Sequence, residues 1–378
     1  MPILHLIATT TFGLEASVKR EIQKLGFSDI QVSDGRIDFT GDESAVPRAN
    51  IWLRSADRVF LCIGEFKALT FDELFEGVKA LPWDEWIPAD GKFTVVGKSV
   101  KSQLFSVSDC QAIVKKAVVE KLKQKYHMEW FPETGAEYKI QVGLLRDVAT
   151  LVIDTSGPGL HKRGYRQDSV IAPIKETLAA AMIELSYWRK DRVLLDPMCG
   201  SGTIPIEAAL IAKNIAPGIM RRFAAEKWER LGAKIWDEAR QEAKDAIDHN
   251  AVPRIYASDV DRRATDHAKR NAIKADVKRY IQFETKPLKD VVLPSEYGVA
   301  IMNPPYGERI GEKNDVEELY RGLGQLLGRE PKWSTYVITS YEGFEKLFGR
   351  KADAKRKLFN GMLKTDYYQY YGERPPRE

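Results

Sequence analysis

Hydrophobic and polar positions in the first 160 residues follow the periods of short strands and helices. Residues 4–9 predict a strand, and apolar residues at helical spacing over 14–25 predict a helix that Gly26 ends. Further predictions are a helix over about 71–81, a strand over 93–96, a helix over about 109–125, and strands over 138–142 and 149–154. This succession is typical of two small α+β units in series.

From about residue 161 the pattern changes to alternating buried strands and amphipathic helices. Strands are predicted over 193–195, 254–258, 280–283 and 298–302, and helices over 175–188, from about 203, and over 262–274. This alternation indicates a doubly wound α/β sheet, in which ligands bind at the carboxyl ends of the strands. Residues 214–247 are interpreted as an inserted segment with a packed helix of its own.

Composition and charge limit the number of domains, the class of protein and the kind of partner that we expect. The length of 378 residues suggests two or three domains. The hydrophobic content of 44% and charged content of 30% are typical of a folded soluble protein. The net charge of +4 permits a nucleic-acid partner without requiring one. Nothing in the sequence indicates an oligomeric state.

The cysteines and the N-terminus exclude several classes of protein. Cys62, Cys110 and Cys199 are widely spaced and follow no ligand pattern, so we expect no disulfide framework, no metal site and a cytoplasmic location. Residues 1–10 lack the basic start of a secretory signal. No apolar run approaches the roughly 18 to 20 residues that span a bilayer, so we expect no membrane partner.

Lysines are concentrated between residues 98 and 125. Seven lysines in this stretch are opposed only by Asp109 and Glu120. Such a bias fits phosphate contact in a bound nucleic acid. The candidates for this contact are Lys98, Lys101, Lys115 and Lys116. A solvated helix face explains the same pattern, so both interpretations stay open.

A glycine-rich, basic loop over residues 155–166 joins the two halves of the chain. Arg163 and Arg166 flank Tyr165 within it, which favours contact with an anionic substrate. A plain linker is the alternative interpretation.

A second glycine-rich turn follows the strand at 193–195. Its sequence is Asp196-Pro197-Met198-Cys199-Gly200-Ser201-Gly202-Thr203. Glycines here let the backbone approach a ligand closely, and the helix that begins at about Thr203 favours a negative group. The spacing matches neither GxGxxG nor GxxxxGK[ST], and the carboxylate of Asp196 argues against a bound pyrophosphate. It suits a cationic ammonium group instead, and S-adenosylmethionine carries one beside a carboxylate and a sulfonium.

The strand at 254–258 ends at Asp259 and Val260. An acid in this position can accept hydrogen bonds from both ribose hydroxyls of a bound nucleoside. The distance from the glycine turn exceeds the usual spacing of about 20 residues, and we attribute the excess to the insertion at 214–247. The two turns together predict a nucleoside-containing cofactor.

The strand at 298–302 ends in Asn303-Pro304-Pro305-Tyr306. Each proline fixes φ and removes an N–H donor, so the Asn303 amide and the Pro304 carbonyl can face a ligand. These acceptors suit an amino group. Tyr306 adds a ring on which a planar base can stack, a contact typically worth about 1–3 kcal/mol. An ordinary turn is the alternative interpretation of these residues.

The pairing of the glycine-rich turn at Asp196–Thr203 with the turn at Asn303–Tyr306 resembles the amino-group methyltransferases that use S-adenosylmethionine. A fuller set of motifs resembles the THUMP-domain RNA methyltransferases, specifically those similar to the guanine-N2 methyltransferase half of the bifunctional 23S rRNA enzyme RlmL. These motifs are GLE at Gly13, SGPGLHKRGYR from Ser156, APIKETLAA from Ala172, NPPYGER from Asn303 and LFNGMLK from Leu358. The resemblance covers nearly the whole chain.

The resemblance implies a fold of three parts. It implies a ferredoxin-like α+β subdomain over residues 1–60 and a THUMP RNA-binding domain over 61–160. A Rossmann-like seven-stranded α/β methyltransferase domain over 161–378 follows them. S-adenosylmethionine is the implied cofactor.

The resemblance also implies roles for individual residues. Asn303 and the Pro304 carbonyl would accept hydrogen bonds from the exocyclic amine of a flipped base, on which Tyr306 would stack. The residues that would line the cofactor are Asp196, Pro197, Cys199, Gly200, Ser201, Gly202, Asp259 and Val260. Arg309 would contact a phosphate.

One position departs from the family pattern. Relatives commonly carry a carboxylate after the third strand for the cofactor's adenine amine, whereas Pro287 stands there in this chain. Glu284 and Asp290 are the candidate substitutes.

We therefore expect a guanine-N2 methyltransferase acting on 23S rRNA or a large-subunit precursor. Adenine N6 in RNA or DNA is the nearest alternative, although the 72 residues after Tyr306 leave little room for a DNA target-recognition domain. A protein glutamine methyltransferase would have little use for the lysine-rich region. A C5-cytosine enzyme needs a cysteine nucleophile, and Cys199 lies in the cofactor turn instead.

The non-enzyme alternative is an RNA-binding ribosome-assembly factor with a vestigial cofactor site. The intact glycine turn, Asp259 and Asn303 argue against it.

Overall fold

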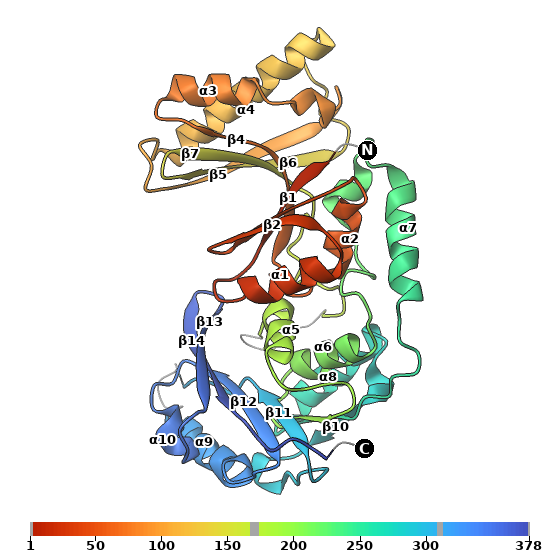
Figure 1. Ribbon diagram of the computed structural model, residues 1–378, viewed down its shortest axis with the longest axis vertical. Helices are drawn as coiled ribbons and strands as arrows, with labels where there is room; N and C mark the ends of the chain where they lie inside the picture. The colour runs from red at the N-terminus through yellow and green to blue at the C-terminus, as the bar shows by residue number, and fades with distance from the viewer. Residues whose placement is uncertain (1–2, 167–173, 308–312, 377–378) are drawn as a thin grey trace. The chain divides into compact units, whose positions relative to one another are not determined.

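The computed structural model describes residues 3–166, 174–307 and 313–376. Within these residues the strands form two sheets of seven strands each, one in each of two units (Figure 1). Unit 1 contains Met1–Thr9, Lys19–Leu160 and Arg221–Glu242, and unit 2 contains Thr10–Val18, His161–Met220 and Ala243–Glu378. Two short segments thus belong to the unit opposite to the one that their position in the sequence suggests.

The sheet of unit 1 has the strand order β2-β3-β1-β4-β7-β6-β5. Its strands are β1 (Leu4–Thr9), β2 (Ser28–Ser33), β3 (Arg36–Gly41), β4 (Arg58–Lys67), β5 (Lys92–Val100), β6 (Glu137–Leu145) and β7 (Val148–Asp154). All neighbouring pairs are antiparallel except β5 and β6. The predicted boundary between residues 60 and 61 falls inside β4, which pairs with β1 on one edge and with β7 on the other. The two α+β parts therefore share one continuous sheet.

Helices cover the sheet of unit 1 and begin at identifiable signals. They are α1 (Glu15–Lys24, whose first residues belong to unit 2), α2 (Ala45–Trp52), α3 (Phe71–Lys79), α4 (Val107–Tyr126) and α7 (Gly232–Asp245), with 3-10 turns at Trp83–Glu85 and Ala224–Lys227. Helix α3 begins with a capping box, in which Thr70 accepts from the Glu73 N–H at 3.1 Å. Helices α3 and α4 lie together on one face of the sheet, α3 against β4 and α4 against β5 and β6 (Figure 1).

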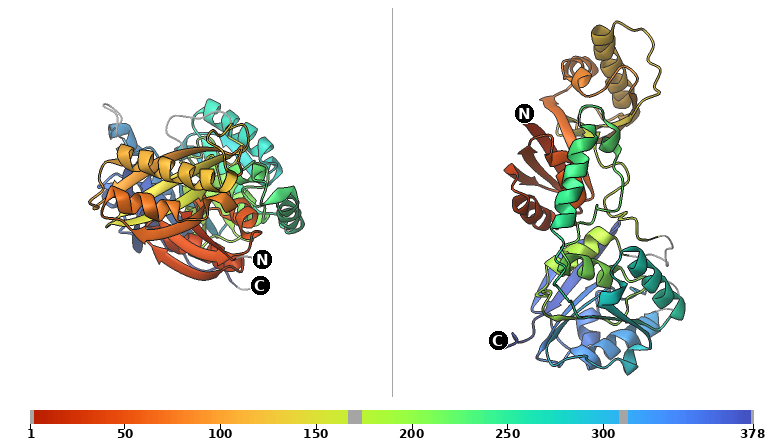
Figure 2. Two further views of the ribbon diagram at one scale, coloured as in Figure 1. Left: turned by 90° about the horizontal axis from the view of Figure 1, so that it is seen from above. Right: turned by 90° about the vertical axis from the view of Figure 1, so that its right-hand side faces the viewer.

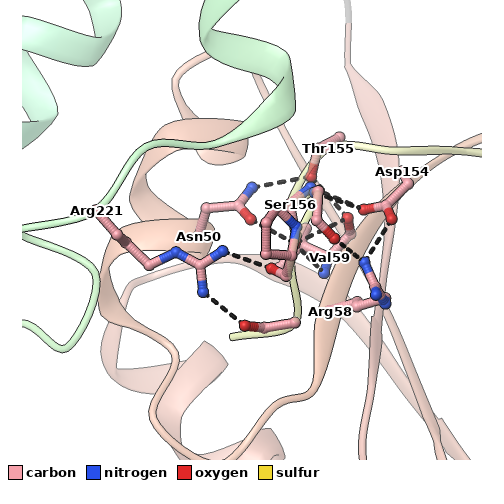
Figure 3. Close-up of polar contacts among 10 residues, drawn as sticks. Asn50, Arg58, Val59, Asp154, Thr155, Ser156 and Arg221 are labelled. Atoms are coloured by element: carbon pink, nitrogen blue, oxygen red, sulfur yellow. Dashed lines mark hydrogen bonds and ion pairs between the residues drawn. The ribbon is translucent and has the colours of Figure 1, made fainter. Parts of the chain in front are cut away.

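A polar cluster fixes the chain where it leaves β7 (Figure 3). Asn50 on α2 donates to Thr155 Oγ1 at 2.9 Å and accepts from Ser156 Oγ at 2.6 Å. Arg221, in the inserted segment, donates to the Gly159 carbonyl at 2.7 Å. All of these side chains are buried, so the contacts satisfy groups that water cannot reach.

The inserted segment is packed along unit 1, as its apolar stripe predicts. Helix α7 lies beside α2 (Figures 1 and 2), and Arg48 on α2 forms an ion pair with Glu242 on α7 at 2.9 Å. The Trp228 indole stacks on Tyr138 of β6 with a centroid distance of 4.9 Å. The insertion thus contributes to the core of the unit that precedes it in sequence.

The sheet of unit 2 has the order β10-β9-β8-β11-β12-β14-β13. Its strands are β8 (Val193–Asp196), β9 (Ile255–Asp259), β10 (Ile281–Thr285), β11 (Gly298–Met302), β12 (Trp333–Thr339), β13 (Ala354–Asn360) and β14 (Leu363–Tyr370). The first five strands of this order are parallel, and β14 and β13 run antiparallel to their neighbours. The order reverses at β8, which places a ligand crevice at the carboxyl ends of β8 and β11.

Helices cover both faces of this sheet. Helices α5 (Glu176–Glu184), α6 (Thr203–Ala212) and α8 (Arg262–Lys274) share one core with Leu194 and Ile301, whereas α9 (Lys313–Leu327) and α10 (Phe344–Phe348) share another with Leu195 and Met302. Short 3-10 turns lie at Lys278–Tyr280 and Leu288–Asp290. Because β8 and β11 are buried on both faces, they are nearly continuous hydrophobic runs in the sequence. Strand β12 is also buried along its length, although it contains Ser334, Thr335 and Thr339.

The Rossmann-like seven-stranded sheet confirms the predicted fold class. Helix α5 ends at Glu184, four residues earlier than Trp188, the end that the pattern predicts. The pattern did not predict β2, β3, α2 or β4, nor did it define the individual elements after residue 306.

Candidate active site

The carboxyl ends of β8, β9 and β11 meet at one cavity of about 900 Å³ in unit 2. Residues named from the sequence that line it are Asp196, Pro197, Cys199, Gly200, Ser201, Asp259, Val260, Asn303, Pro304 and Tyr306. The structure thus brings together turns that lie more than 100 residues apart in the chain. Gly202 is not among the lining residues.

Asp196 is a buried carboxylate at the end of β8. Its side chain is only 1% exposed, and its Oδ1 accepts from the Met198 N–H at 3.2 Å. Burial raises the pKa of Asp196 well above its usual range, and the nearby charge of Asp259 adds to the shift. Within the described residues Asp196 forms no ion pair, and the only neighbouring charge that acts on its pKa is the like charge of Asp259, so a cationic ligand would compensate its charge.

The glycine turn depends on backbone angles that favour glycine. Gly200 has φ of +52° and Gly202 has φ of +82°. Gly202 caps α6, and a Cβ there would lie 2.9 Å from the Cβ of Ala268 on α8. Gly202 therefore serves close helix packing, while Gly200 lets the backbone reach the cavity.

Cys199 is buried in this turn, and burial raises the pKa of its thiol well above the usual range. The thiol therefore stays neutral at physiological pH. A neutral thiol is a poor nucleophile, which agrees with the sequence argument against a covalent cysteine mechanism.

Asp259 ends β9 with both carboxylate oxygens held by backbone donors. Its Oδ2 accepts from the Gly200 N–H at 2.9 Å, and its Oδ1 accepts from the Asp261 N–H at 3.0 Å. Each oxygen keeps a further lone pair for ribose hydroxyls. Val260 beside it is 71% exposed and offers an apolar wall to the cavity.

Two tyrosine hydroxyls form hydrogen bonds that hold the turn after β11 in place. Tyr320 on α9 is fully buried and donates to the Pro305 carbonyl at 2.8 Å. The Tyr306 hydroxyl donates to Asn303 Oδ1 at 2.6 Å. These contacts hold Asn303 in place, and its amide oxygen keeps one lone pair for a ligand.

Apolar residues lie where relatives commonly have a carboxylate for the cofactor's adenine amine. Pro287 and Leu288 line the cavity, whereas Glu284 and Asp290 do not. Glu284 pairs with Lys286, whose hydrogen bond lowers the pKa of that carboxyl, and it faces a separate small cavity of about 140 Å³. The expectation that Glu284 or Asp290 replaces the missing acid is therefore not supported by their positions.

Arg163 is buried in unit 2, which contradicts its prediction as an RNA contact, whereas Arg166 is partly exposed and its prediction stays untested. Arg163 is 4% exposed and lies 3.5 Å from the buried carboxylate of Glu207, to which Tyr165 also donates at 3.0 Å. Arg166 pairs with Glu176 at 3.2 Å and donates to Thr203 Oγ1 at 2.8 Å. The buried acids on α5 and α6, distant in sequence, require these guanidinium groups.

The lysines predicted to contact RNA lie on the surface of unit 1. Lys98 on β5, Lys101 just after it, and Lys115 and Lys116 on α4 are all exposed. The ammonium groups of Lys115 and Lys116 lie 6.0 and 5.7 Å from the ring centroids of Phe93 and Phe75. Arg309 lies outside the described residues.

Sequence reasoning assigned no role to several lining residues. The tip of the β13–β14 hairpin adds Asn360, Gly361 and Leu363, and the start of α5 adds Ile174 and Lys175. The signal for the hairpin was present, because a two-residue turn that begins with glycine, here Gly361-Met362, is common between two strands. Its position beside the cavity depends on the order of strands in the sheet, which the pattern does not give.

The described residues contain no group of three or more histidine, cysteine or acidic side chains that could hold a metal ion. Among them, no helix combines the length and apolar character needed to cross a bilayer.

Three family models match the chain. A model described as "RMKL-like, methyltransferase domain" matches residues 163–369, more than half of the chain. A model described as "RlmL ferredoxin-like domain" matches residues 5–60, and one described as "THUMP domain" matches residues 68–154.

Two curated relatives are similar over most of the chain. "Putative RNA methyltransferase YpsC" of Bacillus subtilis is 52% identical over 376 residues, which are 99% of this chain and 97% of that protein. "Ribosomal RNA large subunit methyltransferase K/L" of Syntrophotalea carbinolica is 34% identical over 95% of this chain. The match spans only 52% of the second protein, so the chain corresponds to about half of it.

Two solved structures share the fold along the whole chain. A protein described as a predicted N6-adenine-specific DNA methylase from Listeria monocytogenes is 51% identical, with a TM-score of 0.95 over 99% of this chain and 97% of that one. SMU.472, described as a putative methyltransferase complexed with SAH, is 43% identical, with a TM-score of 0.94 over all of both chains. These matches confirm the resemblance seen in the motifs: the chain belongs to the RMKL-like methyltransferase family, with RlmL ferredoxin-like and THUMP domains before its methyltransferase domain.

Proposed function

We propose that this chain is an RNA methyltransferase that transfers a methyl group from S-adenosylmethionine to guanine N2 of 23S rRNA or a large-subunit precursor. The observation that carries the proposal is the meeting of Asp196, Asp259 and the Asn303-Pro304 acceptors at one cavity. A cofactor and a base amine can thus be held side by side. The RNA class rests on the THUMP and RlmL ferredoxin-like matches and on the relatives named as RNA and rRNA methyltransferases.

The residues of the cavity fit the cofactor. Asp196 is a buried carboxylate without a cationic partner among the described residues, which suits an α-ammonium group. Asp259 suits the ribose hydroxyls, and Val260, Pro287 and Leu288 form apolar walls for a purine. The neighbour SMU.472 is described as complexed with SAH, the product of this donor. When bound, S-adenosylmethionine supplies an electrophilic methyl group on its sulfonium.

The side chains after β11 would prepare the base amine. Asn303 Oδ1 and the Pro304 carbonyl would accept its two N–H groups, which concentrates the nitrogen lone pair toward the methyl group. After it has taken up the methyl group, the amine would lose one proton to water. No side chain has to act as a strong base, so positioning and electrostatics supply most of the rate enhancement.

Unit 1 would bind the RNA outside the cavity. We retain the division into 1–60, 61–160 and 161–378 as a description of the sequence, with residues 10–18 and 221–242 exchanged between the folded units. Lys98, Lys101, Lys115 and Lys116 would contact phosphates. An rRNA substrate would place the activity in the cytoplasm.

Adenine N6 is the second candidate target. The Listeria neighbour is described as an adenine-specific DNA methylase, and the Asn303 turn fits either amine. The deciding experiment is methylation of rRNA that lacks the modification, followed by nucleoside mass spectrometry. We expect N2-methylguanosine; N6-methyladenosine, or transfer only to DNA or protein, would overturn the proposal.

A further inference from the structure

The tip of the β13–β14 hairpin lies at the base end of the cavity. Strand β13 ends at Asn360, β14 begins at Leu363, and Gly361 takes φ of +66° between them. Asn360, Gly361 and Leu363 line the cavity, whereas Met362 in the same turn is 100% exposed. Asn360 lies within hydrogen-bonding distance of Tyr306, 54 residues earlier in the chain.

The hydrogen bonds around Tyr306 fix the orientation of the Asn360 amide. The Tyr306 hydroxyl has one proton, which it donates to Asn303 Oδ1 at 2.6 Å. Toward Asn360, at 3.3 Å, the hydroxyl can therefore only accept, so Asn360 donates through Nδ2. Its other amide atom, Oδ1, is an acceptor, and no hydrogen bond to this oxygen forms within residues 3–166, 174–307 and 313–376.

The base end of the cavity therefore combines three acceptor oxygens. They are Asn303 Oδ1, which keeps a second lone pair, the Pro304 carbonyl oxygen and Asn360 Oδ1. The chain Asn360–Tyr306–Asn303 holds two of them in a fixed relation, because each hydrogen bond orients the next group. Such preorganised polar groups discriminate strongly against ligands that leave them unpaired.

Guanine and adenine differ in how they match these acceptors. Guanine presents N1–H beside its N2 amino group, so these two neighbouring groups of its Watson–Crick edge are both donors. Adenine presents its N6 amino group beside N1, which is an acceptor. An acceptor beside the amine cradle would pair with guanine N1–H and would face the lone pair of adenine N1.

We propose that Asn360 determines base specificity, with its Oδ1 accepting from N1–H of the target guanine while Asn303 and Pro304 hold N2. This inference rests on the proposed function, because it assumes that a base amine enters the Asn303 cradle. It adds a reason for choosing guanine that the Asn303-Pro304-Pro305-Tyr306 turn alone does not contain.

The test uses an RNA fragment around the nucleotide that mass spectrometry identifies, carrying either guanine or 2,6-diaminopurine. Diaminopurine keeps the 2-amino group but has an acceptor at N1. We expect the wild-type kcat/KM to fall about 10- to 100-fold on diaminopurine, because Asn360 Oδ1 would be left without a donor. Asn360→Ala should lose activity on guanine by a similar factor and treat the two bases alike within about threefold. Met362→Ala, in the same turn, should keep the wild-type ratio.

A further variant separates base recognition from support of Tyr306. Asn360→Asp keeps an acceptor but loses the donor to the hydroxyl, so it should keep a preference for guanine of at least about tenfold. Calorimetry with S-adenosylhomocysteine checks that each variant retains its cofactor site. Equal wild-type rates on the two bases, or an unchanged ratio in Asn360→Ala, would overturn the role of Asn360 and leave guanine methylation standing. Methylation of adenine N6 in rRNA would overturn both.

Discussion

Asp259 accepts a hydrogen bond from the backbone N–H of Gly200 at 2.9 Å, across 59 residues of chain. Gly200 lies in the turn after β8, and Asp259 ends the neighbouring parallel strand β9. One carboxylate therefore holds the glycine turn in place and keeps lone pairs for a ribose. The two halves of the cofactor site are coupled through this contact.

This coupling predicts the effect of changing Asp259. Asp259→Ala removes the ribose acceptor and releases the Gly200 N–H, so the affinity for S-adenosylhomocysteine should fall about 10- to 100-fold, since hydrogen bonds to charged groups contribute about 1.5–3 kcal/mol. Asp259→Asn keeps one acceptor oxygen and should show a smaller loss. Isothermal titration calorimetry measures both. Equal affinities for wild type and Asp259→Ala would remove Asp259 from the cofactor site.

Asn303 should act on turnover and not on cofactor binding. Asn303→Ala removes the acceptor for the base amine, so methyl transfer to rRNA should become undetectable. The affinity for S-adenosylhomocysteine should stay within a few-fold, because Asn303 is placed at the base. Normal turnover in Asn303→Ala would contradict the proposed amine cradle.

Asp196 should lower the stability of the folded protein and favour binding of the cofactor. Its pKa is raised in the folded protein, so its ionisation costs stability as pH rises above the unfolded value of about 4. Asp196→Asn removes this cost and should raise the melting temperature at pH 7–8, with a smaller gain near pH 4, where the wild-type group is protonated. Differential scanning calorimetry across this pH range measures the gain.

The same residue makes cofactor binding depend on pH. A ligand ammonium group favours the ionised form of Asp196, so binding should release a proton and strengthen as pH rises. Titrations in two buffers with different ionisation enthalpies detect the released proton. Asp196→Asn should bind more weakly and show less proton release; an unchanged affinity would separate Asp196 from the ammonium group.

The sequence predicted the features that depend on local pattern and missed those that depend on residues distant in the chain. Asp196, Asp259 and Asn303 each end a short hydrophobic strand, and parallel strands bring their carboxyl ends to one edge, so local pattern was enough to group them. The burial of Arg163 depends on Glu207, 44 residues later, and the place of Asn360 depends on strand order. The hydrophobic pattern contains neither kind of information, because it gives the periodicity of a segment and not the residues that contact it.

The surface lysines should govern the salt dependence of RNA binding. Replacing Lys98, Lys101, Lys115 and Lys116 together with Glu should weaken binding to rRNA and flatten the plot of log affinity against log salt, by about 0.7–0.9 for each phosphate that the protein no longer neutralises. Lys121 is kept, because it lies 3.6 Å from Asp84 in an ion pair. Lys274→Glu, an exposed change on α8 in unit 2, is the control. Filter binding at several salt concentrations gives the slopes, and unchanged slopes would mean that these lysines are a solvated surface.

Arg163 should contribute to stability and not to phosphate binding. Arg163→Ala would leave the carboxylate of Glu207 buried without its cation, which typically costs about 3–5 kcal/mol. Lys162→Ala, the adjacent exposed position, should stay within about 0.5 kcal/mol of wild type. Urea unfolding, with the m-value compared between variants, measures the difference. Filter binding under conditions where Arg163→Ala remains folded should give the wild-type salt slope; a stable variant with a flatter slope would return Arg163 to the RNA interface.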